Sequence, residues 1–157
     1  MESLLIALDS DFSAKKVALI GYEIGKAAEA EITLLHVVQK PTYFSSPKFS
    51  PIIGYDNFNG VETVESDSLP ELVERSESFL SHIKLLLGDE SIKTIVKSGD
   101  YWENILEAAR ELKVDLIVMG THSRKGIDKL LSGSVAEKVL HHSLIPILIV
   151  PVGSVQQ

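Results

Sequence analysis

The segment from Met119 to Val135 gathers the residue types with which proteins bind phosphate groups. Glycines at positions 120, 126 and 133 would let the backbone come close to a ligand. Gly133 and Ser134 directly precede an amphipathic pattern, so we expect them at the start of a helix, where free amides and the helix dipole favour an anion. Nearby hydroxyl and basic side chains could complete the hydrogen bonds: Ser132, Arg124, Lys125 and Lys129. On these residues alone, a phosphate site and an ordinary helix start both stay open.

Other residues that often carry chemistry do not add up to a catalytic or metal site. The sequence has no cysteine, which excludes thiolate catalysis and thiolate metal sites. His141 and His142 are expected at the end of the last helix without a third metal ligand, and His36 is expected as a hydrogen-bonded strand residue. Asp128 and Glu137 have no nucleophile paired with them. We therefore assign no catalytic and no metal-binding residue.

Short apolar runs alternate with amphipathic segments, and this alternation predicts the elements that hold the loop. The apolar runs are expected as strands buried on both faces: residues 4–8, 32–38, 92–96, 116–119 and 145–152. Three of the intervening helices are expected to begin with a capping box: Ser68 with Glu71, Asp100 with Glu103, and Ser134 with Glu137. Gly21 and Gly25 are expected where the first helix packs closely on the sheet. The pattern predicts an α/β fold, a parallel sheet with helices on both faces.

Residues 39–67 interrupt the alternation. They contain prolines, glycines and several aromatic residues without a clear period. A loop of this length is unusual in a compact domain, and it is too aromatic for a plain solvated linker. Two interpretations stay open: a variable excursion with its own small hydrophobic cluster, or a flap over a ligand or partner. We treat residues 1–157 as a single domain that carries this excursion at about 39–67.

Composition and charge narrow the classes of function. With 157 residues, 45% of them hydrophobic and 24% charged, the chain has the make-up of one soluble globular domain. The net charge of −7 disfavours binding to nucleic acid, because an acidic surface repels phosphates. No apolar stretch approaches the roughly 18 residues that a membrane span needs. The first residues, MESLLIALDSD, lack a basic region and are interpreted as a strand rather than a signal peptide, so we expect a cytoplasmic protein.

Ligands of open parallel sheets bind at the carboxyl ends of the strands. That rule selects the segment after the first strand, Asp9 to Asp11, the segment from Val38 onward, and the loop that begins at Gly120. The candidate phosphate loop therefore follows a strand that should end beside the first strand's polar residues.

The same loop resembles the motif of the universal stress protein family. Members carry Gly-x2-Gly-x9-Gly-Ser/Thr after the fourth strand; here Gly120, two residues, Ser123, nine residues and Gly133-Ser134 follow one another. The resemblance extends from LLIALDSD through ITLLHVV and the Gly99 turn to VAEKVL and PILIVPV, and it is weakest at 39–67. It implies a three-layer, Rossmann-like fold with five strands in the order 3-2-1-4-5, usually in a homodimer.

The resemblance also implies a ligand and its contacts. The nucleotide-binding branch of the family holds ATP, and ADP or AMP and a Mg²⁺ ion stay open as further ligands. Asp9 would meet the ribose or adenine, Val37 would line the adenine slot, and Met119 and Gly120 would pack beside the ribose. The phosphate contacts would come from Gly133, Ser134 and Val135. The full candidate site comprises Ala7, Asp9, Val37, Met119, Gly120, His122, Ser123, Arg124, Gly133, Ser134 and Val135.

Ser123 departs from the motif, which has a glycine there. If the backbone at this position needs a positive φ, serine is strained there. Its Cβ would also crowd the ligand. Alternatively, its hydroxyl could donate a hydrogen bond to the ligand. Three classes of function follow. The chain is a nucleotide-binding regulatory module of the stress response, a slow ATPase or autophosphorylating protein, or an interaction protein whose pocket Ser123 blocks. The two retained glycines of the motif favour the first.

Residues 145–152 are expected as an edge strand of the implied sheet. Ile147 to Val150 are apolar in succession, and Pro146 and Pro151 each remove only one backbone donor. Antiparallel pairing with the same strand of a second copy would cover the edge and close at a dimer. We therefore expect a homodimer through this strand, with a protein partner of unknown identity and the nucleotide as further partners.

Overall fold

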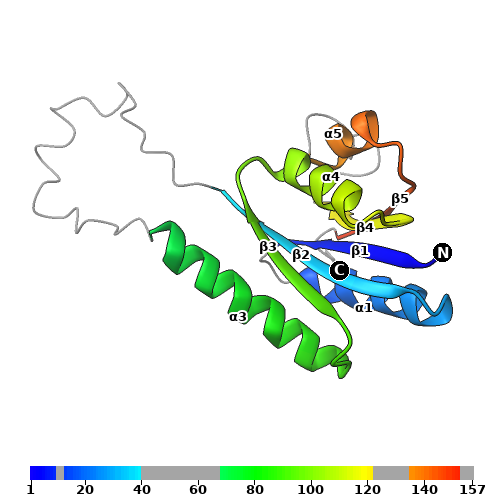
Figure 1. Cartoon of the computed structure of the whole chain (residues 1–157), viewed down its shortest axis with the longest axis horizontal. Helices are drawn as coiled ribbons and strands as arrows, with labels where there is room; N and C mark the ends of the chain where they lie inside the picture. Colours follow the sequence, from blue (N-terminus) through cyan, green and yellow to red (C-terminus); the bar gives the residue numbers. More distant parts are fainter. Residues whose placement is uncertain (10–12, 40–67, 122–134, 153–157) are drawn as a thin grey trace, which may run out of the picture.

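The computed structural model describes residues 1–9, 13–39, 68–121 and 135–152. Strands and helices alternate along these residues, as the apolar runs predict (Figure 1). The strands are β1 (Ser3–Leu8), β2 (Glu31–Val38), β3 (Lys93–Ser98), β4 (Leu116–Thr121) and β5 (Ile147–Pro151). The helices are α1 (Ala14–Ala27), α3 (Leu69–Leu87), α4 (Tyr101–Glu111) and α5 (Val135–His142).

The strands form one five-stranded parallel sheet in the order β3-β2-β1-β4-β5. The predicted α/β class and the strand order 3-2-1-4-5 are therefore confirmed. The register places Ala7 of β1 between Leu35 of β2 and Met119 of β4. Since all strands run in the same direction, the ends of β1, β2 and β4 meet at one edge of the sheet.

Helices cover both faces of the sheet (Figure 1). The side chains of β1 alternate between two core clusters: Leu4 and Ile6 pack with α1 and α3, whereas Leu5 and Ala7 pack with α4 and α5. Burial of apolar side chains on both faces is the main stabilising term for such a sheet. None of the helices in the described ranges is both long enough and apolar enough to cross a membrane.

Two glycines let α1 lie directly on the sheet. A Cβ atom at Gly21 would come 2.6 Å from Ile6 Cδ1, and one at Gly25 would come 2.6 Å from Ile32 Cδ1. Real Cβ atoms do not come so close to other side chains, so the cost of glycine inside a helix is offset by close packing. The predicted reason for these glycines is confirmed.

The predicted helix starts have different outcomes. At α3 the Ser68 amide donates to the Glu71 carboxylate (3.2 Å), as a capping box requires, and Gly88 with φ of 68° ends the helix as expected. The box at Asp100 is wrong: its side chain makes no capping hydrogen bond, and the Asn104 side chain instead donates to the Asp100 carbonyl (2.7 Å). The third box and most of the 39–67 excursion lie outside the described residues.

All five strands differ from the predicted bounds by one or two residues, at one end or at both. β3 extends to Ser98, two residues beyond its apolar run, because its last residues still pair with β2 as far as Val38. β5 begins at Ile147 rather than at residue 145. The Ser143 hydroxyl accepts from the Ile145 amide (3.0 Å) and donates to the Ile145 carbonyl (2.7 Å), which holds that residue in the preceding turn.

Candidate functional site

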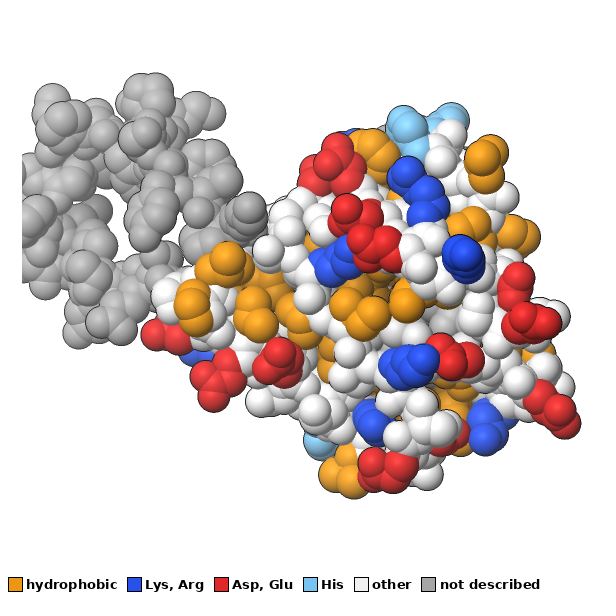
Figure 2. All heavy atoms as spheres, in the orientation of Figure 1, with side chains coloured by type: hydrophobic (Ala, Val, Ile, Leu, Met, Phe, Trp, Pro, Cys, Tyr) orange, Lys and Arg blue, Asp and Glu red, His pale blue; other side chains and the backbone are white. Residues whose placement is uncertain are grey.

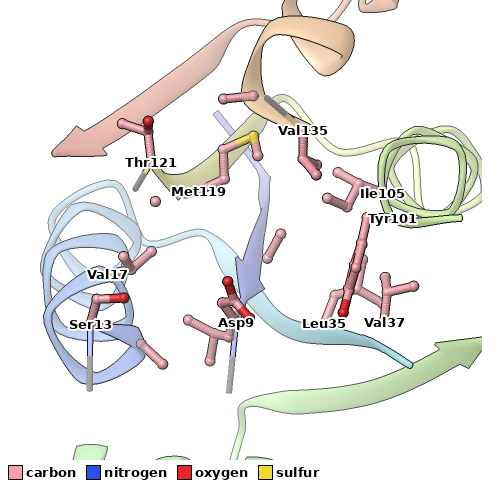
Figure 3. Close-up of a pocket in the computed structure, with 15 residues that line it drawn as sticks. Asp9, Ser13, Val17, Leu35, Val37, Tyr101, Ile105, Met119, Thr121 and Val135 are labelled. Atoms are coloured by element: carbon pink, nitrogen blue, oxygen red, sulfur yellow. The ribbon is translucent and has the colours of Figure 1, made fainter. Parts of the chain in front are cut away.

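A cavity of about 210 Å³ opens where β1 and β4 end (Figure 3). We call it the central hollow. The elements around it are the ends of β1, β2 and β4 and the first turns of α1, α4 and α5. It is lined by Ala7, Leu8, Asp9, Ser13, Ala14, Val17, Leu35, Val37, Tyr101, Ile105, Met119, Gly120, Thr121, Val135 and Ala136. This is the edge at which ligands of parallel sheets bind.

The central hollow has space above the sheet because β1 carries a small residue there. Ala7 lies between the larger Leu35 and Met119 on the sheet face that α4 and α5 cover. Two residues earlier, Leu5 is fully buried on the same face. The change from leucine to alanine along β1 therefore leaves space between the sheet and the helix starts.

The walls of the central hollow are mostly apolar, with a few polar side chains among them. Leu35, Val37 and Ile105 belong to the core cluster under α4, and Tyr101 packs against the same cluster. Asp9 reaches the hollow from the end of β1 (Figure 3). An apolar slot with a few placed polar groups is typical of sites for small organic ligands.

Tyr101 is electrostatically coupled to Asp9. Burial raises the pKa of the Tyr101 phenol above its usual value of 10.0, and the negative charge of Asp9 raises this pKa further. The phenol is therefore neutral at neutral pH and keeps its proton for donation. A hydroxyl donor and a carboxylate acceptor thus belong to the same hollow.

Thr121 contributes a buried hydroxyl at the end of β4. The residue is only 3% exposed, and within the described part of the chain its Oγ1 atom is buried without a hydrogen-bond partner. Such a group lacks the hydrogen bonds that water would give it, at a cost of about 1–3 kcal/mol. The end of β4 therefore carries a buried hydroxyl that the described residues leave without a hydrogen bond.

Gly120 is required by packing inside the protein. A Cβ atom there would come 2.9 Å from Val17 Cγ2 and 3.3 Å from Val152 Cγ2. The glycine therefore lets β4 lie close to α1 and to the residue after β5. Its predicted role in the approach of a ligand stays a prediction.

His36 has the structural role expected for it. The side chain is buried, and Nδ1 lies 2.9 Å from the Leu8 carbonyl; because a carbonyl only accepts, Nδ1 donates. The ring also meets Phe79 edge to face, with 5.5 Å between centroids. His36 thus fixes the end of β1 against β2 and α3, next to Asp9.

The structure brings together one part of the predicted site. Six predicted residues line the central hollow: Ala7, Asp9, Val37, Met119, Gly120 and Val135. Five others lie outside the described residues: His122, Ser123, Arg124, Gly133 and Ser134. Binding of a ligand by any of them stays a prediction.

Sequence reasoning missed several lining residues, on the helices and at the end of β4. Tyr101 could have been predicted from the sequence, because it directly follows the turn after a strand end. Thr121 could have been predicted because it adjoins Gly120. Val17 and Ile105 could not have been predicted, since they follow the helical pattern of ordinary core residues. In the described ranges, no group of three acidic, histidine or cysteine side chains is placed to hold a metal ion.

Comparisons with known proteins agree with this architecture. Residues 1–151 match the model of the universal stress protein family. Universal stress protein MJ0577 of Methanocaldococcus jannaschii is 32% identical over 150 residues, covering 92% of this chain and 93% of that protein. The solved structure of MJ0577 superposes with a TM-score of 0.65 at 24% identity, covering 96% of each chain.

Two other solved structures share the fold. One is a universal stress protein in complex with cAMP (TM-score 0.61, 18% identity, 96% of each chain covered). The other is the Archaeoglobus fulgidus universal stress protein in complex with dAMP (TM-score 0.58, 18% identity, 95% of this chain and 97% of that one). With its sheet order and the match along nearly its whole length, this chain belongs to the universal stress protein family.

Proposed function

We propose that this protein is a regulatory module of the stress response that binds adenine nucleotides, with ATP as its principal ligand, and acts in the cytoplasm as a homodimer. The observation that carries the proposal is the central hollow at the ends of β1 and β4, apolar on its walls and bordered by Asp9. This position is where parallel sheets bind nucleotides.

The apolar walls suit the base. Leu35, Val37 and Ile105 offer the kind of surface on which a planar heterocycle loses little hydration. Asp9 and the Tyr101 hydroxyl provide an acceptor and a donor for the polar edge of the base or for the ribose. Two family members of the same fold have been solved with cAMP and dAMP, which supports adenine as the base.

The start of α5 suits the phosphates. Val135 and Ala136, its first two residues, line the central hollow, so the amino end of the helix faces the hollow. Free amides and the helix dipole favour negative charge at this end. Gly133 and Ser134 directly precede it in the sequence, which is why we retain them as phosphate contacts.

A Mg²⁺ ion would be held mainly by the nucleotide rather than by the protein. Asp9 is the single carboxylate among the described residues that line the hollow. Mg²⁺ often uses one or two carboxylates together with substrate phosphates and water. Asp9 therefore fits as one ligand of a nucleotide-bound ion and is insufficient for a metal site of its own.

The homodimer is proposed through β5. In the described sheet β5 pairs with β4 on one side and with no strand on the other. Ile147 and Ile149 are half-buried, and Leu144, just before the strand, is fully exposed. A two-fold antiparallel pairing would cover these side chains and the free backbone groups together.

The opposite edge of the sheet is protected differently. Lys93 and Lys97 of β3 form ion pairs with Glu31 (2.6 Å) and with Glu107 and Glu111 (2.9 and 2.8 Å). Figure 2 shows acidic and basic side chains next to one another on the face that carries β3. Charged residues disfavour strand pairing, so β5 is the better candidate for a partner strand.

Calorimetry with ATP, ADP and AMP, with and without Mg²⁺, tests the nucleotide site. Ala7→Leu would place a large side chain between Leu35 and Met119 and fill the hollow, so it should abolish binding; Ala7→Ser serves as the matched small substitution and should keep it. A millimolar Kd corresponds to a binding free energy of about −4 kcal/mol. If calorimetry detects no heat of binding up to millimolar nucleotide, the proposal is refuted. Phosphate release faster than about 1 s⁻¹ would show an ordinary enzyme instead.

A further inference from the structure

A second hollow opens next to the central one. It has a volume of about 380 Å³ and lies between the end of β2 and α3. Apolar side chains of Val38, Leu72 and Phe79 line it together with polar ones of Gln39, Arg75 and Ser76. We call it the lateral hollow. Val37 and Tyr101 line both hollows, so they form the partition between them.

The two residues of this partition differ in whether their side chains can be changed without disturbing the sheet. Val37 belongs to β2, which is hydrogen-bonded to β1 and β3, and its side chain is 3% exposed. Tyr101 is the first residue of α4 and reaches the partition with a half-buried side chain. A change of side chain at Tyr101 can therefore open the partition without breaking the sheet.

The turn before α4 holds Tyr101 in place. The Gly99 amide donates to the Val38 carbonyl (2.8 Å), and Gly99 has a φ of 132°, which favours glycine. A Cβ atom at Gly99 would come 2.9 Å from the Asn104 side-chain nitrogen, which itself donates to the Asp100 carbonyl (2.7 Å). Backbone and side-chain hydrogen bonds thus fix the helix start from which the ring projects.

The Tyr101 ring belongs to the apolar part of the central hollow. It packs against the core cluster that contains Leu35 and Val37, and Figure 3 shows it beside these two residues. Asp9 and Ser13 come from the ends of other elements. The ring therefore limits the hollow at the end where the proposed function puts the base.

From this arrangement, and resting on the proposed nucleotide site, we propose that Tyr101 is a specificity-determining residue. Its ring closes the base end of the central hollow against the lateral hollow. The site therefore accepts unsubstituted adenine and rejects adenines that carry a bulky aromatic substituent. Without the ring, the substituent would enter the lateral hollow among Val38, Leu72 and Phe79.

The test compares AMP with three AMP analogues that carry a benzyl or phenyl group at N6, C2 or C8. Calorimetric affinities are measured for the wild type, Tyr101→Ala and Tyr101→Phe. We expect the wild type to prefer AMP over every analogue by about tenfold or more, equal to about 1.4 kcal/mol. In Tyr101→Ala this preference should disappear or reverse for at least one analogue. Tyr101→Phe keeps the ring and should keep the preference, because loss of the hydroxyl weakens AMP and the analogues alike.

Trp102→Ala is the matched control. Trp102 is the next residue of α4, and it packs against the His142 ring (4.6 Å between centroids) and lines neither hollow. Its removal should leave the preference for AMP unchanged, which separates loss of the partition from general loosening of α4. Tyr101→Val replaces Tyr101→Ala if thermal melting shows that the alanine variant does not fold.

The outcomes separate the two proposals. If the wild type binds AMP and Tyr101→Ala retains the full preference against all three analogues, Tyr101 is not the partition and this inference is wrong, while the proposed function stands. An equal loss of preference in Trp102→Ala also overturns the inference. If the wild type binds none of the adenine nucleotides, both proposals are refuted.

Discussion

Replacing Thr121 by valine should stabilise the protein. The two side chains have nearly the same shape and both favour strands, so the main change is removal of the hydroxyl. In the described part of the chain that hydroxyl is buried without a partner, and an unsatisfied group of this kind costs about 1–3 kcal/mol. We therefore expect the free energy of unfolding to rise by about 1–2 kcal/mol. For a chain of this length the midpoint of thermal unfolding should rise by about 2–4 °C per kcal/mol.

Urea unfolding of the nucleotide-free protein, followed by circular dichroism, measures this change. Thr33→Val is the matched control: Thr33 in β2 is also 3% exposed, but its hydroxyl is not among the unsatisfied buried groups. That variant should not gain stability. A loss of more than about 0.5 kcal/mol in Thr121→Val would mean that the hydroxyl has a partner in solution, and the reasoning from an unsatisfied group would be refuted.

The other predictions concern packing, pH and assembly. Gly21→Val should destabilise the fold by about 1–3 kcal/mol in urea unfolding, because its Cβ would meet β1; unchanged stability would contradict the close packing. Hydrogen bonds from Ser91, followed by Lys26, lower the pKa of Asp89 from 3.8 to about 2, so its contribution to stability is complete above about pH 4 and is lost as the pH falls through about 2. The stability difference between wild type and Asp89→Asn should therefore shrink over that interval, and a constant difference would exclude this cause. Lysine at Ile147 and Ile149 should raise the monomer fraction in analytical ultracentrifugation, and a dimer that persists would place the contact on another surface.

The sequence by itself determined the class of fold and the edge of the sheet where a site should lie. Strands buried on both faces must be almost wholly apolar, so the runs at 4–8 and 32–38 are visible without any structure. Strands that alternate with helices form βαβ units, and their right-handed connections place successive strands parallel to one another in one sheet. The strand order came from the family resemblance, and so did most of the predicted ligand contacts.

Tertiary structure alone decided which side chains enclose the central hollow. Val17 and Ile105 follow the same helical period as residues that only fill the core, and the period does not show which of them faces a cavity. The role of Gly120 was likewise hidden, because the contact that requires a glycine joins residues 17, 120 and 152. Periodicity describes how a side chain is oriented on its own element, whereas a cavity depends on distances between elements that are far apart along the chain.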